Sequence, residues 1–113
     1  MLDLRRMAKV TVLPDNIEFE AESGQTLMAA ALARGLYWPT TCGGQGICTT
    51  CLTEVVVGAG HLLDMGRSER KTIVSERGEA ALHKPMRLAC QAIVLNGPIV
   101  VLKGGVRPAE VVA

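Results

Sequence analysis

Four cysteines, the only ones in the chain, have the spacing of a metal site. Cys42, Cys48 and Cys51 lie in one glycine-rich stretch, and Cys90 follows far downstream. Three thiolates from a tight loop and a fourth from a distant segment can enclose two irons bridged by two sulfides, each iron tetrahedral with two protein ligands. The pattern therefore predicts a [2Fe–2S] cluster bound by all four cysteines, a centre that transfers one electron at a time.

The residues between the cysteines suit the charge of such a cluster. Two ferric ions, two sulfides and four thiolates leave two net negative charges, and reduction adds a third. The backbone amides of Gly43, Gly44 and Gly46 can approach sulfur closely because glycine has no Cβ. Hydrogen bonds to sulfur favour the added electron, so these amides are expected to tune the reduction potential. The neighbouring threonines are either further donors or simple strand formers.

Two other uses of the cysteines are open. Structural zinc sites usually contain two Cys-x2-Cys pairs, whereas this chain has one such pair, Cys48 and Cys51. Two disulfides would require an oxidising compartment, and the N-terminal residues show no secretory signal. His61 and His83 lack the spacing of histidine ligands in Rieske centres. Iron–sulfur ligation is the favoured interpretation.

Length and composition indicate one globular domain over residues 1–113. Apolar residues make up 49% of the chain, and only Phe19, Tyr37 and Trp38 are aromatic, so aliphatic side chains must fill most of the core. Tyr37, Trp38 and Pro39, just before the cysteine loop, are expected to pack in that core, and the alternative is that they shield the cluster from water or meet a partner. The net charge of +1 gives no case for nucleic acid or an anionic membrane, and no apolar run could span a bilayer. A cytoplasmic location is expected.

The N-terminal half predicts a sheet covered by a helix. Residues 10–12 and 17–21 alternate apolar and polar side chains on either side of a turn, the pattern of a β-hairpin. Residues 26–34 are rich in helix formers and end at Gly35, which indicates a helix that covers the sheet. Residues 53–57 read as a strand leaving the cysteine loop.

The C-terminal half predicts a short helix and a second hairpin. Ser68 is expected to cap a helix that ends at Arg77 before Gly78. Residues 91–95 and 99–102 flank Asn96 and Gly97, a strong hairpin signal that would put Cys90 at the edge of a strand. Residues 103–113 have the composition of a loose tail. Antiparallel pairs interrupted by helices give an α+β fold, with one main covering helix and a short second helix.

These residues together resemble a known family. Cys-x5-Cys-x2-Cys, a long gap and then Arg87-Leu88-Ala89-Cys90-Gln91 are similar to the adrenodoxin and bacterial assembly-type branch of the [2Fe–2S] ferredoxins. The resemblance implies a β-grasp fold with a mixed sheet, and ligation of the cluster by Cys42, Cys48, Cys51 and Cys90.

The resemblance also implies what such a protein does. It implies a soluble carrier, not an enzyme, that shuttles electrons from a ferredoxin reductase to an acceptor such as an oxygenase or an iron–sulfur assembly system. Such a carrier is expected to be monomeric and to form transient complexes. A redox sensor, or an electron-transfer subunit held permanently by a larger enzyme, is the alternative.

The segment between the third and fourth cysteines departs from this family. Adrenodoxin-like members carry an acidic docking helix there, whereas residues 61–87 hold six basic side chains against four acidic ones: Arg67, Arg70, Lys71, Arg77, Lys84 and Arg87 against Asp64, Glu69, Glu76 and Glu79. If charge steers docking, the partner surface is expected to be less basic than that of the usual partners. The alternative is a solvated helix face without a docking role.

Overall fold

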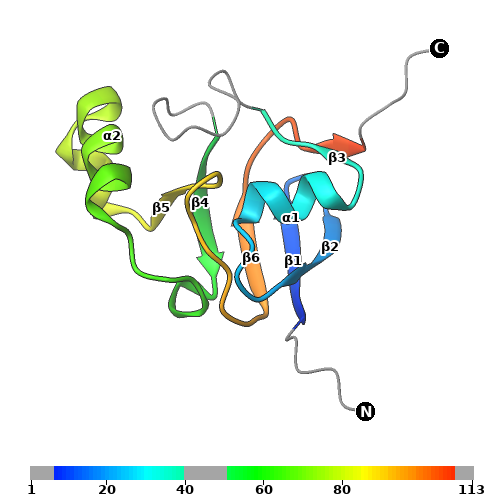
Figure 1. The fold of residues 1–113 in the computed structure, drawn as a ribbon. Coiled ribbons are helices and arrows are strands. Elements are labelled where there is room, and N and C mark those ends of the chain that lie inside the picture. Colours follow the sequence, from blue (N-terminus) through cyan, green and yellow to red (C-terminus); the bar gives the residue numbers. More distant parts are fainter. Residues whose placement is uncertain (1–6, 40–50, 109–113) are drawn as a thin grey trace.

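The computed structural model describes residues 7–39 and 51–108, which form a mixed sheet with one helix on its face and another beside its edge (Figure 1). Five strands pair in the order β2-β1-β6-β4-β5, and β3 and β7 form a separate pair. The elements are β1 (Met7–Leu13), β2 (Ile17–Glu22), α1 (Leu27–Ala33), β3 (Leu36–Tyr37), β4 (Leu52–Val57), η1 (Ala59–His61), α2 (Arg67–Arg77), η2 (Glu79–His83), β5 (Met86–Leu88), β6 (Ile99–Leu102) and β7 (Arg107–Pro108).

The predicted N-terminal hairpin is confirmed. β1 and β2 pair antiparallel, with Val10 opposite Phe19, and the buried residues alternate with exposed ones along both strands. Asn16 closes the turn at a φ of 58°, a left-handed conformation that asparagine tolerates better than most residues. The alternation puts one face of this hairpin into the core.

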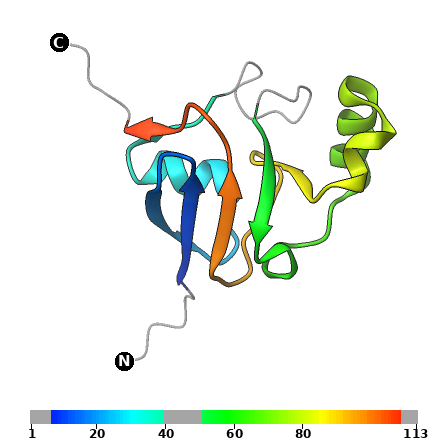
Figure 2. The same ribbon diagram turned by 180° about the vertical axis from the view of Figure 1, so that it is seen from behind.

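Helix α1 is also confirmed, and it packs on one face of the sheet (Figure 1). The Thr26 hydroxyl caps it by accepting from the Ala29 amide at 3.0 Å. Its buried residues meet a core that includes Val10, Val12, Ile99 and Val101: they are Leu27, Met28, Ala30 and Ala31. The view from behind shows the opposite sheet face without a helix over it (Figure 2).

The hairpin predicted from Asn96 and Gly97 is wrong. Strand β6 lies between β1 and β4, parallel to β1 and antiparallel to β4. The residues before the turn bond elsewhere: the Val94 amide donates to the Gln25 carbonyl oxygen at 2.8 Å, and the Leu95 amide to that of His61 at 2.9 Å. The expected strand 91–95 is thus replaced by isolated bridges. A central position gives the apolar β6 a strand on both sides, which the hairpin would not provide.

Helix α2 forms where it was predicted and ends before Gly78, but its cap differs. Gly66 occupies the N-cap position without a side-chain hydrogen bond, so the assignment of the cap to Ser68 is wrong. Ser68 lies inside the first turn and is exposed. With 11 residues, α2 is longer than α1, which has seven.

The loose tail predicted for residues 103–113 is wrong for its first half. Strand β7 pairs antiparallel with β3, and Val106 before it is only 1% exposed. The Arg107 guanidinium lies 4.7 Å from the centre of the Tyr37 ring, a cation–π contact that adds to the pairing. Residues 109–113 lie outside the described part of the chain.

No helix in the described ranges combines the length and the apolar character needed to cross a bilayer.

Gly58 offers a test of the close packing where β4 ends. Its φ is 89°, and a Cβ at this position would collide with the Pro98 carbonyl oxygen. We expect Gly58→Ala to lower the free energy of unfolding by about 2 kcal/mol or more, because it adds backbone strain to a steric clash. Urea unfolding at matched cluster content measures this. Gly60→Ala is the control, since its Cβ would meet nothing within 4 Å; equal losses in both variants would contradict the prediction.

Candidate metal centre

The structure brings two of the four predicted ligands together. Cys51 immediately precedes β4, and Cys90 lies in the turn after β5, so the strand beside Cys90 precedes it instead of following it as predicted. Although they are 39 positions apart in the sequence, their Sγ atoms are 3.4 Å apart. Both side chains are buried. Cys42 and Cys48 lie outside the described residues.

This sulfur pair fits a shared metal ion. A tetrahedral metal with bonds of about 2.3 Å to sulfur holds two thiolates about 3.8 Å apart, close to the separation seen here. A disulfide would require an S–S distance of about 2.05 Å, and both cysteines are free. In residues 7–39 and 51–108, no group of three or more His, Cys, Asp or Glu side chains gathers as a metal site. Cys51 and Cys90 therefore have a spacing that suits two ligands of one metal ion.

The thiol of Cys51 is held in its protonated form when no metal is bound. The adjacent Cys90 thiol and burial, in that order, raise the pKa of Cys51 far above its ordinary value. The backbone amides of Cys90 and Ala89 act in the opposite direction, since they favour the thiolate. Metal binding must displace this proton, so affinity is expected to fall as the pH falls.

Hydrogen bonds surround the two ligands. The Gln91 side-chain amide lies 3.7 Å from the Cys90 sulfur as a donor. The Trp38 indole N–H donates to the Cys51 carbonyl oxygen at 3.4 Å, and the Ala89 amide reaches the same oxygen at 3.3 Å. Trp38 is 1% exposed, which confirms the core role predicted for it, whereas Tyr37 is 39% exposed and the same prediction is wrong for that residue.

Helix α1 holds the Cys90 turn from one side. The amide of Met28 donates to the Ala89 carbonyl oxygen at 2.9 Å, and the amide of Leu27 donates to that of Ala92 at 3.0 Å. The first amides of a helix have no partner within the helix, so these bonds satisfy both the helix and the turn. The start of the covering helix therefore fixes the backbone around Cys90.

A buried carboxylate holds the same turn from the other side. Glu69 of α2 is 3% exposed and accepts from Arg87 twice, at 2.7 and 3.0 Å. Its Oε2 also accepts from the Leu88 amide at 2.9 Å. Sequence reasoning missed this contact because it counted both charges as surface charges. One signal was present: Glu69 precedes Ile73, the fully buried residue of α2, by one turn on the same helix face.

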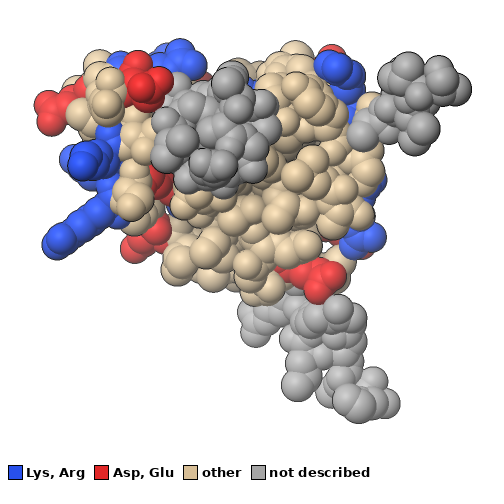
Figure 3. All heavy atoms as spheres, turned by 45° about the horizontal axis from the view of Figure 1, so that its top comes forward, with Lys and Arg blue, Asp and Glu red and all other residues tan. Residues whose placement is uncertain are grey.

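The exposed charge of residues 61–87 remains net positive without this pair. Five basic side chains and three acidic ones are exposed: Arg67, Arg70, Lys71, Arg77 and Lys84 against Asp64, Glu76 and Glu79. Figure 3 shows basic side chains gathered on the α2 side with acidic ones among them, and a broad uncharged area towards α1. The two sides of this face therefore differ in charge.

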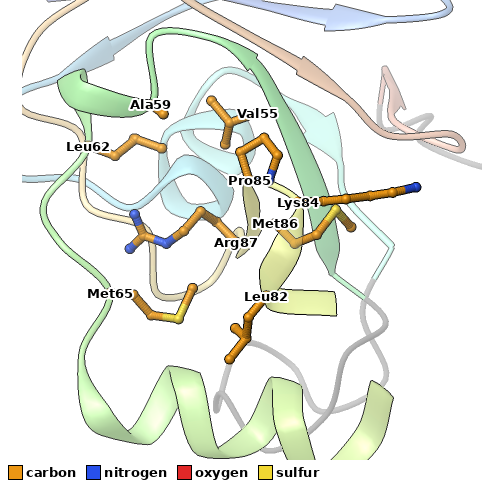
Figure 4. Close-up of a pocket in the computed structure, with 9 residues that line it drawn as sticks. All are labelled: Val55, Ala59, Leu62, Met65, Leu82, Lys84, Pro85, Met86 and Arg87. Atoms are coloured by element: carbon orange, nitrogen blue, oxygen red, sulfur yellow. The ribbon is translucent and has the colours of Figure 1, made fainter. Parts of the chain in front are cut away.

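An apolar pocket of about 220 Å³ lies between α2 and the β4–β5 edge (Figure 4). Its apolar lining includes Leu62, Met65, Leu82 and Met86, and the Lys84 side chain points away from them. Pockets that bind organic substrates usually measure about 300 Å³ or more. Neither Cys51 nor Cys90 lines this pocket, so it is separate from the sulfur pair.

Comparison with known proteins agrees with the fold and the sulfur pair. Residues 10–95 match the family of 2Fe-2S iron-sulfur cluster binding domains. The reductase component DmpP of phenol 2-monooxygenase from Pseudomonas sp. strain CF600 is 36% identical over 92 residues, which span 80% of this chain and 24% of that protein. The 2Fe-2S ferredoxin-5 of Aquifex aeolicus is 35% identical over 91 residues, spanning 80% of this chain and 91% of that one.

A solved structure shows the same likeness in three dimensions. The ISC-like [2Fe-2S] ferredoxin FdxB from Pseudomonas putida superposes with a TM-score of 0.70 at 25% identity, covering 86% of this chain and 92% of that chain.

Fold and site together define a β-grasp iron–sulfur protein. More specifically, the chain belongs to the [2Fe–2S] ferredoxin family, and it is a one-electron carrier whose cofactor is a [2Fe–2S] cluster. The predicted fold, cofactor and family are confirmed. This result decides between iron–sulfur and zinc ligation in favour of the cluster.

The Glu69 carboxylate provides a test of how the Cys90 turn is held. We expect Glu69→Ala to cost about 3–5 kcal/mol of unfolding free energy, because it leaves a largely buried Arg87 without its anion and the Leu88 amide without an acceptor. Urea unfolding and the rate of cluster loss measure the effect. Glu76→Ala, an exposed change on the same helix, should stay within about 0.5 kcal/mol of the native chain. A Glu69→Ala loss no larger than that control would refute the role.

Proposed function

We propose that Cys42, Cys48, Cys51 and Cys90 bind the [2Fe–2S] cluster, and that the chain shuttles electrons from a reductase to an acceptor protein. The observation that carries the ligand proposal is the 3.4 Å approach of the Cys51 and Cys90 sulfurs. This pair would hold one iron, which leaves Cys42 and Cys48 for the other. When bound, the cluster supplies a reversible one-electron couple.

The surrounding residues would hold the pair in place and tune it. Glu69 and the first amides of α1 fix the Cys90 turn on two sides, so the ligands need not move when the oxidation state changes. Gln91 donates towards the Cys90 sulfur, an interaction that favours the reduced state. The chain thus contributes rigid ligand geometry and hydrogen bonds, while the redox change belongs to the cluster.

The relatives indicate the class of partner protein and not a particular partner. A relative that is the reductase component of an oxygenase supports a partner of the oxygenase type. Because the chain spans only 24% of that relative, permanent attachment to a larger enzyme is the second candidate. The Aquifex aeolicus relative is a 2Fe-2S ferredoxin, which supports the carrier role. We propose a cytoplasmic monomer that forms transient complexes.

We further propose that the chain catalyses no reaction on a substrate of its own. Membership of the [2Fe–2S] ferredoxin family supports this proposal. Electron delivery requires only that the cluster lie near a partner and that its ligands stay fixed.

The ligand proposal is tested by cysteine replacement. The native chain, purified without oxygen, should contain about two irons and two acid-labile sulfides, and dithionite should produce an EPR signal. Cys51→Ala and Cys90→Ala should each lose most of the iron and the native EPR signal, because each removes one of four ligands. Ser75→Ala, at an exposed position, is the control. Full native iron content in Cys90→Ala would reject its ligand role, and the native chain without iron would reject the function.

The basic surface of α2 makes a separate prediction about the partner. We expect Arg70→Glu combined with Lys71→Glu to slow electron transfer to an acidic partner about tenfold or more at low salt, since steering depends on opposite charges. Stopped-flow rates at several ionic strengths measure this. Lys9→Glu combined with Arg34→Glu makes the same change in net charge away from α2. Equal rates for the two double variants would show that α2 is only a solvated face.

A further inference from the structure

Lys103 lies where the centre of the sheet reaches the metal centre. In the β4–β6 pair Glu54 is opposite Leu102, so continuing the register by one residue puts Lys103 opposite Thr53. Opposed residues of antiparallel strands point to the same face, and so do residues two apart in one strand. The Lys103 side chain therefore begins on the same face of the sheet as Cys51.

The backbone of Lys103 is held in this position. Its amide donates to the Leu13 carbonyl oxygen at 2.8 Å, which continues the β1–β6 ladder by one residue. On the β4 side, the Thr53 hydroxyl donates to the Leu102 carbonyl oxygen at 3.0 Å. The position of the lysine relative to Cys51 is thus set by the sheet.

The Lys103 side chain is half-buried. Burial lowers the pKa of Lys103, the Cys51 sulfur raises it, and the Arg77 guanidinium lowers it. The effect of the Cys51 sulfur agrees with the position that the strand register gives Lys103, on the Cys51 side of the sheet.

A cation acts differently on the two oxidation states of a cluster. The oxidised cluster has two net negative charges and the reduced cluster has three, so a nearby cation stabilises the reduced form more. The interaction is stronger where the cation is partly withdrawn from water, as Lys103 is, than at a fully exposed position.

We propose that the Lys103 ammonium raises the reduction potential of the cluster. This inference rests on the proposed ligand role of Cys51. The lysine would act through its charge and would touch neither a substrate nor iron.

Redox titration of the cluster-loaded protein tests this role. Lys103→Met should lower the potential, so that at a fixed ambient potential the ratio of reduced to oxidised cluster falls about three- to tenfold. Lys103→Arg keeps the charge and should stay close to the native chain. Lys9→Met makes the same substitution on the exposed side of β1 and should change nothing.

The outcomes separate charge from packing. A Lys103→Met potential equal to the native value, or an equal shift in Lys103→Arg, would overturn the role of Lys103. If Lys103→Met takes up no cluster, Lys103→Gln and Lys103→Arg still decide, since equal potentials in these two variants reject the role of the charge. If the native chain itself takes up no cluster, the proposed function fails before this inference. If the native chain binds a cluster but the reduction potential of Lys103→Met equals the native value, this inference is rejected and the proposed function stands.

Discussion

The approach of two sulfurs from distant segments is the constraint on which the rest of the structure depends. The Cys51 and Cys90 sulfurs lie 3.4 Å apart although the two cysteines are 39 positions apart in the sequence. Pairing of β4 with β5 brings the segments together, the start of α1 holds the Cys90 turn by two amides, and Glu69 holds it through Arg87 and Leu88. Two helices that share no sequence signal for metal binding thus serve one pair of thiols.

This arrangement suits an electron carrier because the contacts that hold the two cysteines are separate from the exposed residues that could contact a partner protein. The ligand turn is fixed by buried contacts, whereas the exposed charges of α2 are free to vary without disturbing the sulfurs. In the sequence Glu69 and Arg87 count among the surface charges, but in the structure both side chains are largely buried and form an ion pair. A family with this fold can therefore change its partner surface while keeping its centre.

Local signals in the sequence predicted local structure well. The hairpin of β1 and β2, the capped helix α1 and the end of α2 each follow from patterning within a few residues. The cysteine spacing predicted the cofactor, and the structure confirms that Cys51 and Cys90 meet. The wrong predictions concern non-local contacts. The segment around Val94 bonds to residues 25 and 61 instead of pairing with β6. Val106 is buried although the glycines next to it in the sequence suggested a loose tail. The burial of Glu69 depends on its non-local contacts with Arg87 and Leu88, and its one signal in the sequence was the helical spacing to Ile73.

The central place of β6 has a consequence for synthesis. This strand comes late in the chain, yet it joins the N-terminal hairpin to β4. A nascent polypeptide emerging from the ribosome can form the first hairpin and α1 early. The hairpin cannot be joined to β4, however, until β6 has been made through residue 102. Non-local pairing of this kind slows folding and leaves apolar edges uncovered for longer. The site for iron is therefore finished only after nearly all of the described chain has been made.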